Sequence, residues 1–248
     1  MEPKILCLGD SLTQRGWEVE SHGWVAQLAA AYLRRYDVLN RGFGGYNTRW
    51  TRHLLPRMLP QSLRNMRLIT LFFGANDAQI APYKQHVPLP EFSSNLRAIV
   101  ETFSSPDSAL YAPDALIVLI TPPPVGEKMW SRDRESKSKP FDRNNDVARQ
   151  YAQAVVQLAA ELDLPCVDLW SEIERRVEGL REMPFDGYEE FTCDGLHLNA
   201  KGNDLLAQLL RTTVDEREPK LKPENIPWLL PDHNGIHEGT VEEILTFL

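Results

Sequence analysis

Short apolar runs alternate with longer amphipathic segments along most of the chain. Four of these runs are continuous and bounded by turn residues, as buried parallel strands are: 5–8, 68–73, 115–120 and 166–169. A weaker run at 37–39 precedes Asn40-Arg41-Gly42. The pattern therefore predicts five strands.

The intervals between the strands have apolar residues at helical spacing. This spacing predicts helices around residues 24–32, 54–58, 90–100, 147–162 and 199–210. Pro90 and Asn199 stand where two of these helices begin, and Asn144-Asn145 are candidates for capping the longest.

Strands that alternate with helices of this length predict βαβ units and a sheet covered on both faces. The expected fold is α/β, with a five-stranded, doubly wound parallel sheet. We expect one domain over 1–218 and a proline-rich C-terminal extension over 219–248, either packed along that domain with a short helix at 241–248 or forming a mobile arm. The segment 121–140 is expected to be an insertion over the end of the fourth strand.

Composition narrows the class of protein. The 248 residues are 42% hydrophobic, enough for one large core, and the net charge of −8 argues against nucleic acid or an anionic membrane as the main partner. Three cysteines without a CxxC pair argue against a disulfide framework or a zinc site and suit a reducing compartment. No apolar stretch approaches the ~20 residues of a membrane span, and no signal peptide is recognised, so a cytoplasmic location is expected.

Three polar or glycine-rich motifs directly follow predicted strands. Ser11 follows the first strand, Gly44-Gly45 the second and Asn76 the third. Ligands of open α/β sheets bind outside the carboxyl ends of the strands, so the fold would gather these residues in one crevice. Each motif alone is also typical of an ordinary turn.

Ser11 is the candidate nucleophile. A hydroxyl needs a base to remove its proton as it attacks, and the preceding Gly9 allows a sharp turn after the strand. The surrounding residues do not form the G-x-S-x-G elbow of α/β-hydrolases. A simple strand-to-helix turn capped by Asp10 or Ser11 is the alternative.

His197 is the candidate base because Asp194 lies three residues before it. A carboxylate beside the imidazole fixes its tautomer and stabilises the imidazolium that forms during attack. An Asp-x-x-His segment also occurs as a surface turn that caps the next helix. A zinc site is disfavoured because no second histidine or cysteine pair has ligand spacing.

Acyl transfer also needs hydrogen-bond donors for the negative charge that develops on the carbonyl oxygen. The backbone N–H groups of Ser11 and Gly45 and the side-chain amide of Asn76 are the candidates for this oxyanion hole. No metal and no cofactor are expected.

Together these motifs resemble the GDSL, or SGNH, hydrolase superfamily. The resemblance extends roughly from residue 4 to residue 213 and implies a flavodoxin-like three-layer α/β/α sandwich without a metal. It also implies the roles given above for the triad and the oxyanion hole. The four matching blocks are Gly9-Asp10-Ser11-Leu12, Gly45, Gly74-Ala75-Asn76-Asp77 and Asp194-Gly195-Leu196-His197.

Longer strings are similar to the isoamyl acetate-hydrolysing esterase group. This resemblance implies a serine esterase acting on short-chain esters, particularly acetates of small alcohols. An acyltransferase or thioesterase that uses the same acyl-enzyme, or a non-catalytic binding protein, is the alternative. The sequence does not decide the oligomeric state, and a homodimer is one possibility. The matching strings are 41–50, 73–78, 87–92 and 194–198 with Lys201-Gly202.

Overall fold

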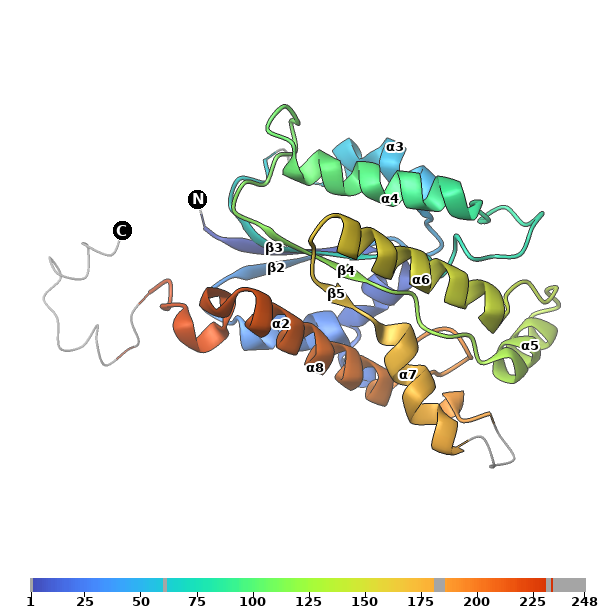
Figure 1. Ribbon diagram of the computed structural model, residues 1–248. Helices are drawn as coiled ribbons and strands as arrows, with labels where there is room; N and C mark the ends of the chain where they lie inside the picture. The colour runs from blue at the N-terminus through green and yellow to red at the C-terminus, as the bar shows by residue number, and fades with distance from the viewer. Residues whose placement is uncertain (1, 60–61, 181–185, 231–232, 234–248) are drawn as a thin grey trace, which may run out of the picture.

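The computed structural model describes residues 2–59, 62–180, 186–230 and 233, and within these residues five strands form one parallel sheet (Figure 1). The strand order is β2-β1-β3-β4-β5, and every neighbouring pair is parallel. The strands are β1 (Lys4–Gly9), β2 (Asp37–Gly42), β3 (Met66–Phe72), β4 (Leu116–Ile120) and β5 (Cys166–Val167). The order reverses between β1 and β3, which creates a switch point where a ligand site is expected.

Helices cover both faces of the sheet. In Figure 1, α3, α4 and α6 lie above it, and α2 and α8 lie below it. The predicted three-layer α/β/α fold is therefore confirmed. The helices are α1 (Ser11–Gln14), α2 (Trp24–Ala31), α3 (Thr48–Met58), α4 (Leu89–Ser104), α5 (Glu127–Ser136), α6 (Asn145–Glu161), α7 (Leu169–Val177) and α8 (Ala200–Arg217).

The sheet separates two hydrophobic cores, because successive side chains of a strand point to opposite faces. Ile5 and Cys7 of β1 belong to the core between the sheet and the helices α2 and α8. Leu6 and Leu8 belong to the core between the sheet and the helices α3, α4 and α6. All four side chains are fully buried, which explains why this strand has a continuous apolar sequence.

The fifth strand is shorter than its sequence predicts. The apolar run 166–169 predicts four strand residues, but β5 ends at Val167. Asp168 instead caps α7 by accepting a hydrogen bond from the backbone N–H of Ser171 at 3.1 Å. Leu169, which is fully buried, is therefore the first residue of a helix and not the last residue of the predicted strand.

The segment expected to be an insertion contains a helix, α5. This helix has one buried residue, Trp130, so it lacks the repeated apolar positions that predict a helix. It is held against the loop before α8, where the backbone N–H of Gly126 donates to the carbonyl of Gly195 at 2.8 Å. The segment therefore lies beside the residues predicted to form the active site.

The first part of the C-terminal extension packs against α2 and the residues that follow it. Leu221 and Ile226 are buried in the core between the sheet and α8. The Tyr32 hydroxyl donates to the Leu221 carbonyl at 2.7 Å, and the Arg34 guanidinium lies 4.1 Å from the centre of the Trp228 ring. The short helix expected at 241–248 lies outside the described residues.

Candidate active site

Ser11 is the first residue of α1, at the carboxyl end of β1. Asp10 caps this short helix by accepting a hydrogen bond from the backbone N–H of Leu12 at 2.9 Å. The turn therefore has the cap that an ordinary strand-to-helix connection would have. In addition, it places the Ser11 hydroxyl 3.0 Å from Nε2 of His197, which is 186 residues away in the sequence.

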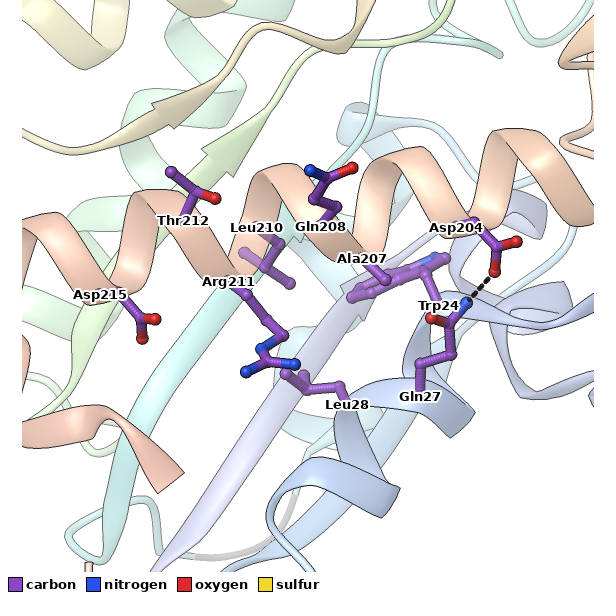
Figure 2. Close-up of a pocket in the computed structure, with 10 residues that line it drawn as sticks. All are labelled: Trp24, Gln27, Leu28, Asp204, Ala207, Gln208, Leu210, Arg211, Thr212 and Asp215. Carbon is purple, nitrogen blue, oxygen red and sulfur yellow. Dashed lines mark hydrogen bonds between the residues drawn. The ribbon is translucent and has the colours of Figure 1, made fainter. Parts of the chain in front are cut away.

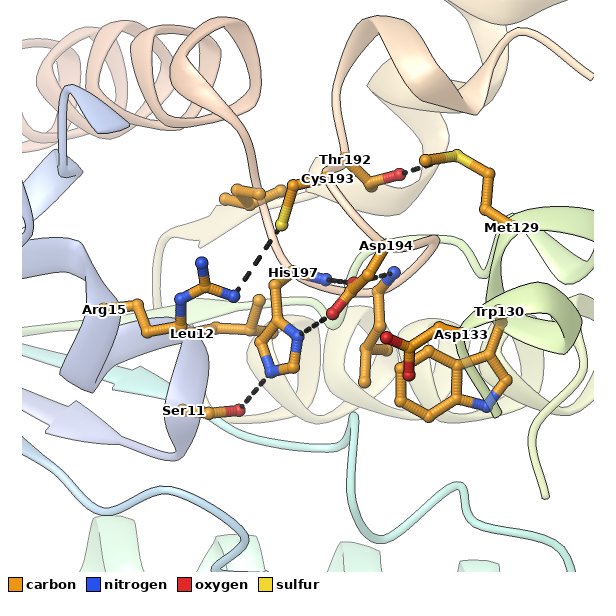
Figure 3. Close-up of polar contacts among 12 residues, drawn as sticks. Ser11, Leu12, Arg15, Met129, Trp130, Asp133, Thr192, Cys193, Asp194 and His197 are labelled. Atoms are coloured by element: carbon orange, nitrogen blue, oxygen red, sulfur yellow. Dashed lines mark hydrogen bonds and ion pairs between the residues drawn. The ribbon is translucent and has the colours of Figure 1, made fainter. Parts of the chain in front are cut away.

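Ser11, His197 and Asp194 form one continuous row of hydrogen-bonding groups (Figure 3). Nδ1 of His197 lies 2.7 Å from Oδ2 of Asp194. An ionised carboxylate only accepts hydrogen bonds, so Nδ1 carries the imidazole proton and Nε2 is left to accept from the Ser11 hydroxyl. This is the tautomer that a general base for Ser11 requires.

Several interactions keep Asp194 ionised. Burial opposes its charge, but the hydrogen bond and positive potential of His197, together with the backbone N–H groups of Leu196 and His197, outweigh burial and lower the carboxyl pKa well below its usual range. These N–H groups donate to Oδ1 at 2.9 and 2.8 Å. The second oxygen is thus left for the imidazole.

The turn between Asp194 and His197 depends on Gly195. Its φ of +91° lies in the left-handed region, and a Cβ there would come within 2.4 Å of the Gly126 carbonyl oxygen. The turn is closed by a 2.8 Å hydrogen bond from the Cys193 N–H to the His197 carbonyl. Glycine is therefore required both for the backbone conformation and for the close approach of α5.

The structure also brings Gly45 and Asn76 to the cleft that contains Ser11. Nδ2 of Asn76 donates one hydrogen bond to the Tyr46 carbonyl at 2.8 Å, and a primary amide has a second hydrogen on this nitrogen. Gly45 has a φ of +82°. The predicted oxyanion donors therefore lie in the same cleft as the nucleophile.

This cleft has a volume of about 500 Å³ and lies at the carboxyl ends of the strands. Six segments line it: the three turns after β1, β2 and β3, the loop 79–85, the region from α5 to α6, and the turn before α8. The lining residues are Ser11, Gly44, Gly45, Asn76, Gln79, Tyr83, Gln85, Trp130, Arg134, Lys139, Pro140, Asp142, Arg143, Leu196 and His197.

Aromatic side chains also lie near this cleft, and of Phe43, Tyr46, Trp50 and Trp130 only Trp130 is among the lining residues. Phe43 and Tyr46 pack against the core under α3 and α4, with ring centres 5.3 Å apart. Trp50 stands edge-on to Tyr46 at 6.2 Å. Phe43 and Tyr46 therefore contribute to core packing, whereas Trp50 is exposed.

A second cavity, of about 320 Å³, lies between α2 and α8 (Figure 2). Gln27 donates to Asp204 at its edge, at 2.9 Å, and Trp24 lies at its base. Its lining contains none of Ser11, Asp194 and His197. The candidate chemistry therefore belongs to the larger cleft.

Two buried carboxyl groups lie directly behind the site. Burial raises the pKa of Asp10 to about 7 and that of Asp77 to about 6, and the charge of Asp77 adds to the shift of Asp10. One carboxyl oxygen of each, Oδ2, is buried without a hydrogen-bond partner within the described part of the chain. The charges of the two carboxyl groups interact, and neither group lines the cleft.

No group of three or more histidine, cysteine, aspartate or glutamate side chains within the described residues is arranged to hold a metal ion. Across the same residues, no helix is long and apolar enough to cross a membrane.

Comparison with known proteins identifies the family. Residues 7–205 match the GDSL-like lipase/acylhydrolase family. The chain belongs to this family. It is 37% identical to an isoamyl acetate-hydrolyzing esterase 1 homolog of Mus musculus, over 97% of this chain and 90% of that protein. It is 30% identical to the isoamyl acetate-hydrolyzing esterase of Saccharomyces cerevisiae, over 94% of each chain.

The fold is also that of the GDSL-like family. The crystal structure of a lipase/acylhydrolase from Enterococcus faecalis superimposes with a TM-score of 0.60 at 22% identity, covering 87% of this chain and 96% of that chain. Membership of the family makes this GDSL-like protein a carboxylic ester hydrolase, as its motifs predict.

Sequence reasoning missed several of the lining residues, among them Arg143, whose side chain hydrogen-bonds to that of Asn76. Arg143 is only 4% exposed, and its Nη2 donates to Oδ1 of Asn76 at 2.9 Å. No motif marks this arginine, and it lies 67 residues from its partner in the sequence. A polar position just before the capping pair Asn144-Asn145 was the one available signal.

Proposed function

We propose that the protein is a serine esterase that hydrolyses short-chain carboxylic esters, such as acetates of small alcohols, through an acyl-enzyme. The observation that carries the proposal is the continuous row of Ser11, His197 and Asp194 in a cleft that also contains Gly45 and Asn76. The names of the mouse and yeast relatives, which specify isoamyl acetate, support the choice of substrate.

In the first half of the proposed reaction, Oγ of Ser11 attacks the ester carbonyl carbon while Nε2 of His197 takes the hydroxyl proton. The imidazolium that forms is stabilised by the adjacent Asp194 carboxylate, which stays ionised. His197 then gives this proton to the alcohol oxygen as the carbon–oxygen bond breaks. The alcohol leaves, and the acyl group stays on Ser11.

In the second half, water replaces the alcohol. Nε2 of His197 takes a proton from the water as its oxygen attacks the acyl carbon. The proton then returns to Oγ of Ser11 as the acyl group is released as a carboxylic acid. Both halves pass through a tetrahedral intermediate with a negatively charged oxygen.

We assign the oxyanion hole to the N–H groups of Ser11 and Gly45 and to Nδ2 of Asn76. The support for Asn76 is its orientation: Oδ1 is held by Arg143, so the amide cannot be turned to present this acceptor to a negative charge. Donors fixed in advance stabilise developing charge without reorganising during the reaction.

The proposal extends to the setting of the enzyme. The partner is a small-molecule ester rather than nucleic acid, in keeping with the net charge of −8. Cys7, Cys166 and Cys193 are free thiols, which supports a reducing, cytoplasmic location. We expect no cofactor, and we expect residues 219–248 to form an extension of the domain over 1–218.

The direct test compares hydrolysis of p-nitrophenyl acetate, butyrate, octanoate and palmitate by the wild type and by Ser11→Ala. Ser93→Ala is the matched control, because the Ser93 hydroxyl donates to Leu89 within its own helix, away from the cleft. We expect the wild type and the control to favour the short esters, and Ser11→Ala to lose this activity.

Equal activity of Ser11→Ala and the wild type would contradict the assignment of the nucleophile. Hydrolysis confined to palmitate would contradict the preference for short acyl chains. Release of p-nitrophenol with transfer of the acetyl group to an added alcohol, rather than to water, would favour a transferase.

A further inference from the structure

A buried arginine contacts the predicted oxyanion hole but takes no part in the proton transfers of the proposed reaction. Arg143 is 4% exposed and lies just before α6. Its Nε donates to the Ala75 carbonyl at 3.1 Å, and its Nη1 donates to Oδ2 of Asp142 at 3.2 Å. A buried guanidinium with this many defined partners has a single orientation.

The second terminal nitrogen of Arg143 contacts both parts of the predicted hole. Nη2 donates to Oδ1 of Asn76 and to Oε1 of Gln85, each at 2.9 Å. The amide nitrogen of Gln85 in turn donates to the Gly45 carbonyl at 2.8 Å. Arg143 thus holds Asn76 directly and the loop of Gly45 through one intermediate side chain.

The contacts form a closed ring, because Nδ2 of Asn76 donates to the carbonyl of Tyr46, the residue after Gly45. Each member of the ring has its hydrogen-bonding direction fixed by the next. The guanidinium has donors only, so Asn76 and Gln85 must both turn their carbonyl oxygens toward it and their amide nitrogens away. The nitrogen of Asn76 is consequently turned away from the guanidinium, with one hydrogen beyond the one that Tyr46 accepts.

The positive charge of Arg143 has a second effect on Asn76. A hydrogen bond from a charged donor to an amide oxygen polarises the amide, and hydrogen-bonded groups in a chain strengthen one another at low dielectric. The N–H groups of Asn76 therefore become stronger donors. Within the described residues, Asp142 is the carboxylate that pairs with Arg143, and it accepts from Trp130 at 2.8 Å as well.

We propose that Arg143 is a positioning residue for catalysis, which orients and polarises Asn76 and fixes the Gly45 loop so that both are ready for the oxyanion. The proposal rests on the proposed function, because it requires that an oxyanion forms at Ser11. It assigns to Arg143 no contact with the substrate. Its removal should therefore lower kcat and leave KM for a neutral ester nearly unchanged.

A double-mutant cycle on p-nitrophenyl acetate tests this inference with the full chain. Since one oxyanion donor is worth ~10²–10³ in turnover, Arg143→Met should lower kcat about 10- to 100-fold in the wild-type background. In an Asn76→Ala background the same substitution should lower kcat by less than about threefold, because the donor that Arg143 holds directly is already gone and only its indirect contact with the Gly45 loop, through Gln85, remains. Arg143→Lys, which keeps the charge beside Asp142, should recover part of the loss.

Arg134→Met is the matched control. Arg134 also lines this cleft, and its guanidinium carbon lies 4.0 Å from the centre of the Trp130 ring. It pairs with Asp133 and not with Asn76. Its effect on kcat should be the same in the wild-type and Asn76→Ala backgrounds. Circular dichroism and thermal melting establish that each variant is folded, and if Arg143→Met is not, the cycle is run with Arg143→Lys.

Three results would overturn the inference. Losses from Arg143 and Asn76 substitutions that multiply, as for Arg134, would show that Arg143 acts independently of Asn76. A rise in KM with unchanged kcat would show that it binds substrate. Full activity of Arg143→Met would show that it has no part in the reaction. Activity retained by Ser11→Ala would instead mean that the proposed function itself is wrong.

Discussion

Asp10, the residue before the nucleophile, should make the protein less stable as the pH rises. It is fully buried, one of its oxygens has no partner within the described residues, and burial raises its pKa from 3.8 to about 7. A carboxyl group with a raised folded-state pKa contributes stability below its unfolded pKa and loses this contribution as the pH rises through the folded value. Asp10→Asn removes the titration.

The size of the effect follows from the two pKa values. A shift of about 3 units corresponds to about 4 kcal/mol at pH values above 7. Part of this loss has already occurred at pH 5, so the free energy of unfolding of Asp10→Asn relative to the wild type should rise by about 3 kcal/mol between pH 5 and pH 9. The carboxyl of Asp77 shares in the titration, because the charges of these groups interact.

Urea unfolding at a series of pH values measures this difference. Asp107→Asn, at an exposed carboxyl in the loop after α4, is the control for the loss of one formal charge. A difference between Asp10→Asn and the wild type that changes by less than about 1 kcal/mol from pH 5 to pH 9 would refute the reasoning.

Three further substitutions test other parts of the molecule. Asn76→Ala should lower turnover by ~10²–10³ in a protein that still folds, as steady-state kinetics and circular dichroism would show. An unchanged turnover would exclude Asn76 from the oxyanion hole. Asp194→Asn should lower kcat by roughly 10⁴, because the imidazole loses the partner that fixes its tautomer; wild-type kinetics would contradict this role. Leu221→Ala should lower the free energy of unfolding by about 2–5 kcal/mol, measured in urea, since its side chain is buried; no loss would mean that the extension is not part of the core.

The sequence predicts the site best where a polar, potentially catalytic residue directly follows an apolar run. Ser11 and Asn76 come after buried apolar runs, and parallel strands bring such positions to the same edge. The pair Asp194 and His197 is local, so a spacing of three residues is enough to predict their contact. Each motif alone is also typical of an ordinary turn, so these residues were predictable because several such motifs occur together, in order, along one chain.

Other features depend on contacts that no local pattern records. Arg143 meets Asn76 across 67 residues, and its role is visible only when the turn after β3 and the start of α6 are placed side by side. Trp130 is the one buried residue of α5, so this helix had no apolar periodicity to reveal it. The early end of β5 was missed because the predicted run 166–169 includes Asp168, the polar residue that caps α7 and so ends the strand.

The central claim is that Ser11 becomes acylated during turnover. Rapid mixing with p-nitrophenyl acetate, acid quenching within the first turnover and mass spectrometry of the digested protein would locate the acetyl group. The account predicts one acetyl group on the peptide that contains Ser11 and none in Ser11→Ala. Acetylation at another residue, or turnover with Ser11 never modified, would contradict it.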